Sequence, residues 1–347
     1  HAFATEGSLM GPILEEFVGN RKELAETLES LLIDALRDKN RTIPEKIPTI
    51  RITAQGGVGT AEEHRLLIER YKLDSVGWGS PFLLVPEATT VDQETLGKLV
   101  AADEKDLYLS NISPLGVPFN NLKDNSKDME KTEKIEAGRP GSPCPKEYLA
   151  LHAQPGSRSL CTASRQYQRN KIKLLDRDEL SEEEFNRNYN GIVEKACLCM
   201  GLGEASMQVY DLDPSADKKG VAICPGPNMA YFSSIMSLRE MADHIYGRIN
   251  VIAKKNRPQM FVKELQLYLS YLSNKIDEIQ GVPSKKQQKY LNAFSKNLQD
   301  GIDYYRSFTE QVKDIYKEGF ERIEEELSLQ NADMNKLQER LALLRLS

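Results

Sequence analysis

Two glycine-rich turns, one after each of two short apolar runs, constrain the fold of this chain more than any other feature. Residues 50–54 lead into the turn 55–60, Gln-Gly-Gly-Val-Gly-Thr, and residues 74–76 lead into Gly77-Trp78-Gly79-Ser80. The segment between them has the apolar spacing of an amphipathic helix. This pattern predicts a strand, a helix and a second strand. Because the carboxyl ends of neighbouring parallel strands meet at one edge, we expect the two turns to lie together.

The start of the intervening helix predicts an anion site. Thr60 is followed three residues later by Glu63, which is the spacing of a capping box. The free amide groups of the first helical turn would then point toward the glycines, where they attract an anion. The alternative is that residues 56–59 form only a tight turn, since a single glycine-rich loop is weak evidence.

Composition limits the class of protein. The 347 residues are 40% hydrophobic, which is enough for two or three domains with cores of their own. A net charge of −6 argues against a general nucleic-acid binder, because binding to phosphate backbones needs a concentrated basic face. No apolar run approaches a membrane span and no secretory signal precedes His1, so we expect a cytoplasmic protein.

The five cysteines all fall between residues 144 and 224, after a charged and glycine-rich stretch, 123–142, that is typical of a linker. One hypothesis is an iron-sulfur or zinc site made of Cys144, Cys197, Cys199 and Cys224, with Cys161 as an alternate ligand. The alternatives are ordinary buried thiols and a redox-active or nucleophilic cysteine. Basic and polar residues near Cys161 could meet an acidic substrate or a flavin phosphate, or form a solvated face: Arg158, Arg165, Gln166, Arg169 and Lys171.

Helical periodicity dominates the last third of the chain. Capping and breaking residues predict helices over about 237–254, 258–280, 284–327 and 331–345. Apolar residues recur every three or four positions from Tyr290 to Val312, which indicates a bundle whose partner is in the chain or in a second subunit. The end, Met334 to Leu346, looks suited to docking on another subunit.

The order of the glycine turns, followed by residues 110–117, Ser-Asn-Ile-Ser-Pro-Leu-Gly-Val, resembles the FMN-binding (β/α)8 barrel of the glutamate synthase family and, more loosely, nitronate monooxygenase-type flavoproteins. The resemblance covers about residues 1–122. It implies that these residues have an α/β fold, the C-terminal part of a TIM-type barrel. The cysteine-bearing segment at 143–232 and the α-helical domain at 233–347 follow it in the chain. The resemblance also implies an FMN phosphate held by residues from both turns: Gln55, Gly56, Gly57, Gly59, Thr60, Gly77, Trp78, Gly79 and Ser80.

The chain departs from this family in two ways. Ala102, Tyr108 and Ser113 stand where the family has the cysteines of an iron-sulfur cluster. Only about three strand-helix units precede Asn125, whereas a barrel needs eight, so we expect the remaining strands upstream or on another chain. The resemblance implies an FMN-dependent oxidoreductase acting on a small molecule, as an oligomer. The alternatives are a degenerate barrel or subunit that binds a phosphorylated metabolite or a protein partner without redox turnover, and a barrel enzyme that uses no flavin.

Overall fold

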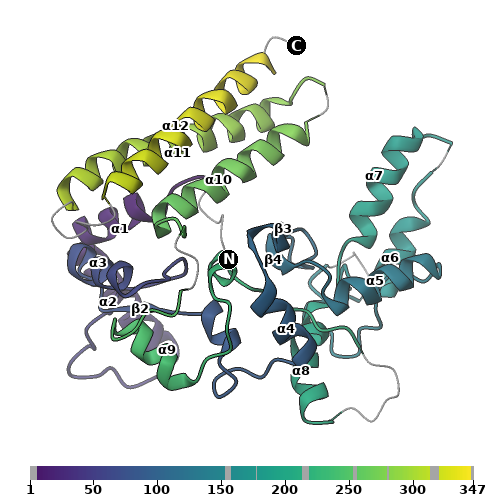
Figure 1. Ribbon diagram of the computed structural model, residues 1–347. Coiled ribbons are helices and arrows are strands. Elements are labelled where there is room, and N and C mark those ends of the chain that lie inside the picture. Colours follow the sequence, from purple (N-terminus) through teal and green to yellow (C-terminus); the bar gives the residue numbers. More distant parts are fainter. Residues whose placement is uncertain are drawn as a thin grey trace. The chain divides into compact units, whose positions relative to one another are not determined.

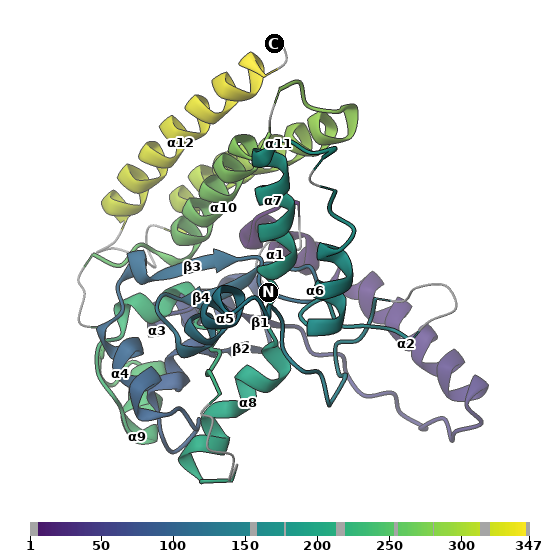
Figure 2. The same cartoon turned by 90° about the vertical axis from the view of Figure 1, so that its right-hand side faces the viewer.

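The computed structural model describes residues 6–152, 158–176, 178–212, 219–252, 256–279, 281–312 and 320–344, with the main chain alone for 320 and 321. These residues divide into two compact units (Figures 1 and 2). The bundle unit contains residues 6–78, 244–250 and 256–344, and the hairpin unit contains residues 79–243 and 251–252. This division differs from the predicted boundaries at 122, 142 and 232, because the glycine-rich segment and the C-terminal helices share one core.

The bundle unit contains the predicted strand-helix-strand segment. Strand β1 (Thr53–Gln55) runs parallel to β2 (Ser75–Gly77), and helix α3 (Ala61–Tyr71) connects them. Leu66, Leu67 and Tyr71 of α3 are buried, as the apolar spacing requires. The remaining helices of this unit are α1 (Met10–Gly19), α2 (Arg21–Asp38), α10 (Met260–Asp277), α11 (Lys285–Val312) and α12 (Phe320–Leu343).

Helices α10, α11 and α12 pack on one another as a three-helix bundle (Figures 1 and 2). The periodic residues of α11, among them Leu298 and Ile302, face this core. The predicted break near residue 330 is wrong, because α12 continues through it. Leu337 and Leu341 of α12 are each 6% exposed and belong to the same core. These side chains are therefore covered by the chain itself, and the expectation that they dock on another subunit is wrong for them.

Helix α1 lies against α11 at two glycines. A Cβ atom at Gly11 would lie 2.5 Å from Cε1 of Tyr305, and one at Gly301 would overlap the side chain of Leu9. Helix α1 ends at Gly19, and the chain leaves the helical conformation at Asn20 before α2 begins. Glycine and asparagine are weak helix formers, which explains the break at Gly19-Asn20.

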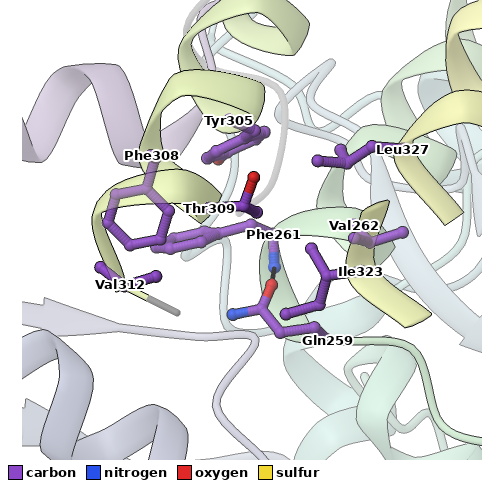
Figure 3. Close-up of a pocket in the computed structure, with 9 residues that line it drawn as sticks. All are labelled: Gln259, Phe261, Val262, Tyr305, Phe308, Thr309, Val312, Ile323 and Leu327. Carbon is purple, nitrogen blue, oxygen red and sulfur yellow. Dashed lines mark hydrogen bonds between the residues drawn. The ribbon is translucent and has the colours of Figure 1, made fainter. Parts of the chain in front are cut away.

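The bundle contains a small apolar cavity (Figure 3). It encloses about 10 Å³, roughly the space that one water molecule needs. The side chain of Gln259 lies at its edge and accepts a hydrogen bond from the amide of Phe261 at 2.7 Å. The residues that line the cavity are Gln259, Phe261, Val262, Tyr305, Phe308, Thr309, Val312, Ile323 and Leu327. A space this small is a packing gap rather than a ligand site.

The hairpin unit is built around the antiparallel pair β3 (Leu107–Ser110) and β4 (Phe119–Leu122). Its core cluster contains Ile112, Phe119, Ala196, Leu198 and Ala222. Its helices are α4 (Gln93–Ala101), α5 (Ser126–Glu136), α6 (Arg165–Ile172), α7 (Glu182–Val193) and α8 (Leu198–Val209), with short 3-10 turns η1 (Ser80–Leu84), η2 (Glu104–Asp106) and η3 (Pro227–Tyr231). The chain leaves the hairpin unit and enters the bundle unit within helix α9 (Leu238–Ile245), after Asp243.

The predicted linker at 123–142 is wrong, because most of it is α5. The side chain of Asn125 caps this helix by accepting from the amide of Asp128 at 2.9 Å. Burial raises the pKa of Glu130, but hydrogen bonds from Lys127 and Lys134 outweigh it and lower that pKa to about 2. A charged sequence therefore forms an ordered helix here, because its charges are paired with one another.

The chain is rich in helix, and the sheets among the described residues are two separate pairs of strands. One pair is parallel and one is antiparallel, so these residues do not form a closed barrel. In the described parts of the chain, every helix is too short or too polar to cross a bilayer.

We expect the substitution Leu298→Ala to lower the free energy of unfolding by about 3 kcal/mol, because this fully buried side chain would leave a cavity between the helices. The variant Lys289→Ala, on an exposed position of the same helix, should change it by less than about 0.5 kcal/mol. Urea unfolding of both variants measures the difference, and equal losses would contradict the assignment of this core.

The carboxyl group of Glu264 predicts a pH dependence of stability. It accepts from the amide of Met10 at 2.9 Å and from the hydroxyl of Tyr305 at 3.0 Å. Burial nevertheless raises the pKa of Glu264 to about 7. The folded chain then keeps a proton that the unfolded chain releases near 4.5, so stability falls as pH rises from about 4.5 to 7, by at most about 1.4 kcal/mol per pH unit.

Urea unfolding between pH 4.5 and 8 measures this slope in the wild-type protein and in Glu264→Gln, which removes the titrating group. We expect the variant to lose that part of the slope. The substitution Glu310→Gln removes an exposed carboxylate from α11 and should leave the slope as it is. If Glu264→Gln keeps the full wild-type slope, the buried carboxyl group is not its source.

Candidate functional site

The carboxyl ends of β1 and β2 meet at one edge of the bundle unit. Gln55 and Gly77 are paired in register, so the turn 56–59 and Trp78 leave the sheet side by side. Gly56 and Gly57 have φ angles of +100° and +78°, which side chains rarely adopt. A Cβ at Gly56 would meet nothing within 4 Å, whereas one at Gly77 would lie 2.6 Å from the Gln55 side chain. The first turn therefore presents main chain beside open space.

The start of α3 has the predicted capping box. The Thr60 hydroxyl accepts from the amide of Glu63 at 3.2 Å, and the Glu63 carboxylate accepts from the amide of Thr60 at 3.2 Å. The same carboxylate also accepts from the amides of Gly59 at 2.8 Å and Met260 at 2.7 Å. Glu63 is 2% exposed. The protein thus places a carboxylate of its own at the positive end of this helix.

Sequence reasoning missed one residue at this edge, Arg257. Its guanidinium lies 2.7 and 2.9 Å from the two oxygens of Glu63 and donates to the carbonyl of Gly57 at 2.9 Å. It occupies the space left by the missing side chain of Gly59, where a Cβ would lie 2.6 Å from the guanidinium. Because Arg257 follows Gly59 by almost two hundred residues, no local pattern could reveal the contact.

Two histidines lie beside the second turn. The indole N–H of Trp78 donates to Nδ1 of His64 at 3.0 Å, and burial lowers the pKa of His64. Nε2 of the buried His244 lies 2.9 Å from the carbonyl of Gly59, to which it donates, and its ring meets the Trp78 ring edge-on at 5.6 Å. These contacts hold Trp78 in place, and they join the two turns through His244.

Gly79 and Ser80 belong to the hairpin unit, in which the Ser80 hydroxyl accepts from the amide of Gly226 at 2.7 Å. Of the nine predicted phosphate contacts, the bundle unit brings seven together: Gln55, Gly56, Gly57, Gly59, Thr60, Gly77 and Trp78. The candidate site of this unit is the edge formed by these residues with Glu63 and Arg257.

The hairpin unit contains all five cysteines as free thiols. The Sγ atoms of Cys197 and Cys199 lie 3.8 Å apart. Burial raises the pKa of Cys161, and the neighbouring thiols of Cys144 and Cys197 raise it further. Cys224 has a different setting: burial raises its pKa, and its thiol accepts from the amide of Asn120. The thiols of Cys144 and Cys197 thus lie near enough to Cys161 to influence its pKa.

A pocket of about 650 Å³ opens beside two of these thiols. Cys144 and Cys161 line it, together with Arg165 and Arg169 of α6 and Lys173, the residue that follows this helix. Of the basic and polar residues predicted near Cys161, Gln166 also lines the pocket, whereas Arg158 pairs with Glu147 and Lys171 lies over the ring of Tyr167. Among the described residues, no group of three or more His, Cys, Asp or Glu side chains stands in a geometry that could hold a metal ion.

Comparisons with known proteins add no family to this description. No protein-family model matches the chain, and neither the curated proteins nor the solved structures contain a match.

We expect Arg257→Ala to lower the free energy of unfolding by about 3–5 kcal/mol, because it leaves the Glu63 carboxylate buried without its charged partner. The matched control is Arg21→Ala, which breaks the ion pair with Asp74, whose two side chains are 36% and 33% exposed. That loss should be at most about 1 kcal/mol. Urea unfolding at pH 7 compares the two, and similar losses would contradict the structural role of the buried pair.

Proposed function

We propose that the edge formed by the turns after β1 and β2 binds the phosphate of FMN, and that the chain is part of a flavin-dependent oxidoreductase. The observation that carries this proposal is the in-register parallel pairing of Gln55 with Gly77. It brings two glycine turns to one edge, where barrels commonly hold a phosphate. Flavin would supply the redox chemistry, and the protein would bind and orient it.

The open space beside Gly56 supports the proposal. A phosphate needs close access to main-chain amides, and side chains at left-handed glycine turns would obstruct it. Arg257 adds a positive charge beneath the loop, but Glu63 neutralises most of it. We therefore assign phosphate contacts to the main chain of the turn 56–57, and to Arg257 and Glu63 the role of holding that turn in shape.

The exposed face of α2 supports a further part of the proposal, namely that other strands and helices complete a barrel. Helix α2 has no buried residue, and its apolar side chains at Leu28, Leu31 and Leu32 are 38%, 59% and 41% exposed. Residues at this spacing form one helical stripe, and such stripes normally pack on another element. An upstream segment or a companion chain would cover it and supply the remaining strands.

A second candidate function is the binding of a phosphorylated metabolite without redox turnover. The same glycine edge favours it equally, because a phosphate dianion is the shared group. The two functions differ in the need for an isoalloxazine ring, and so a visible spectrum of the purified full protein separates them. A yellow flavin spectrum supports the first function, and a colourless protein that binds inorganic phosphate supports the second.

Binding of FMN and riboflavin, followed by flavin fluorescence, tests the phosphate assignment directly. We expect FMN to bind at least about tenfold more tightly than riboflavin, since charge-assisted hydrogen bonds contribute about 1.5–3 kcal/mol. Gly56→Ala should reduce FMN affinity to that of riboflavin and leave riboflavin binding unchanged.

The control for this variant is Gly281→Ala. Gly281 also has a positive φ and open space at the Cβ position, but it lies in the turn between α10 and α11. The variant Gly281→Ala should leave the affinity for FMN unchanged. Equal binding of FMN and riboflavin by the wild-type protein, or an unaltered FMN affinity in Gly56→Ala, would contradict a phosphate site at this turn.

A further inference from the structure

The pocket of about 650 Å³ in the hairpin unit has a row of positive charges along one wall. Arg165 and Arg169 of α6 line it, as does Lys173, which follows the helix and keeps a helical conformation. Residues four apart lie on the same face of a helix, so these three form a basic stripe about 12 Å long. Small-molecule sites have volumes of roughly 300–1,000 Å³, and this pocket is therefore large enough for a metabolite.

The protein does not compensate the charge of the basic stripe. Glu147 is the one carboxylate among the described residues that line the pocket, and it pairs with Arg158. No described carboxylate forms an ion pair with Arg165, Arg169 or Lys173. Cations of one sign in a cleft raise the local concentration of anions, because the electric field concentrates there. The pocket therefore attracts an anionic ligand.

Arg165 has a donor that lacks an acceptor. Its Nε atom is buried and has no hydrogen-bond partner among the described residues. A buried donor without a partner is costly, and most such atoms are hydrogen-bonded. The planar guanidinium can donate two parallel hydrogen bonds to one phosphate or carboxylate group. An anion in the pocket that Arg165 lines would supply the missing acceptor.

Main-chain contacts hold the start of α6 against the segment that precedes Cys144. The amide of Arg165 donates to the carbonyl of Ser142 at 2.9 Å, and the amide of Ser142 donates to the carbonyl of Ala163 at 3.1 Å. Gly141 has a φ of +80°, and a Cβ there would lie 2.7 Å from Cα of Arg165. The two segments thus pack main chain against main chain at the pocket wall.

A buried glutamine also fixes α6. The side-chain amide of Gln168 bridges two carbonyls, those of Thr162 at 3.3 Å and Lys195 at 3.0 Å. Gln168 is completely buried, so this glutamine bridge is protected from water. The helix that carries the basic stripe is therefore in position before a ligand binds, which lowers the ordering cost of binding.

We infer that this pocket binds a small metabolite that carries two or more phosphate groups. Three cations spread over about 12 Å exceed what one phosphate contacts. A phosphate group carries about −1.5 to −2 charges at neutral pH, so two such groups match the three unpaired cations. The inference concerns the hairpin unit alone and does not depend on flavin binding at the glycine edge.

Calorimetric titration of the intact protein with inorganic pyrophosphate, at low ionic strength, tests the inference. We expect pyrophosphate to bind at least about tenfold more tightly than orthophosphate, because its second phosphate reaches further cations of the stripe. The variants Arg169→Ala and Lys173→Ala, both at exposed positions, should each lower the affinity for pyrophosphate by at least about tenfold. The matched variant Lys171→Ala removes a cation of α6 that does not line the pocket, and it should leave the affinity unchanged.

Alkylation of the thiols by iodoacetamide, followed by mass spectrometry, locates the bound pyrophosphate. Cys144 lines the pocket and is partly exposed, whereas Cys199 is partly exposed but is not among the lining residues. Pyrophosphate at about ten times its Kd should slow the alkylation of Cys144 by about tenfold and leave that of Cys199 unchanged.

Three results would overturn the inference. The first is pyrophosphate binding that is absent or no tighter than that of orthophosphate. The second is an unchanged affinity for pyrophosphate in Arg169→Ala or in Lys173→Ala. The third is an unaltered rate of Cys144 alkylation when pyrophosphate is bound.

Discussion

The buried ion pair between Glu63 and Arg257 joins the two halves of the bundle unit. Both side chains are almost completely withdrawn from water, at 3% and 6% exposed, and each would be very unfavourable alone. The pair is bidentate, and the amides of Gly59 and Met260 complete the hydrogen bonds of the carboxylate. The turn after β1 and the start of α10 are thus held in one arrangement, although they are far apart in sequence.

This arrangement explains why the strand-helix-strand segment is stable in a sheet of two strands. Such a small sheet needs a further apolar layer, because two strands alone bury little surface. Ala54 and Val76 of the strands belong to the same core as Leu265 and Leu298 of the bundle. The C-terminal helices therefore supply a layer to which the glycine edge is anchored. The turn after β1, with its left-handed glycines Gly56 and Gly57, is thereby fixed to the core.

Local signals predicted local structure well. The capping box at Thr60 and Glu63, the parallel strands and the periodic core of α11 depend on residues within a few turns of one another, and all three are present. The helix at 126–136 was missed because its charged residues resemble a linker unless their pairing is known. Arg257 was missed for a different reason, since the space it fills is created by a glycine elsewhere in the chain.

The contacts of the cysteines could not be predicted from the sequence for the same reason, because they join residues that are far apart in the chain. Their clustering in sequence is real, but the neighbours of each thiol depend on the strand-like contact of Ser142 with Ser164 and on the glutamine bridge at Gln168. Residues next to Cys161 and Cys197 bond to the loop after β3, at Pro114 and Ile112, although both cysteines come long after that loop in the sequence.

The missing side chain at Gly59 also limits how this sequence can change during evolution. Any larger residue at position 59 would overlap the guanidinium of Arg257. Loss of the arginine alone would leave the Glu63 carboxylate buried without its charged partner. Substitutions at these positions are therefore acceptable only in combination. An arginine at position 59 could pair with Glu63 in place of Arg257, and position 257 could then change. Homologues should therefore vary these two residues together.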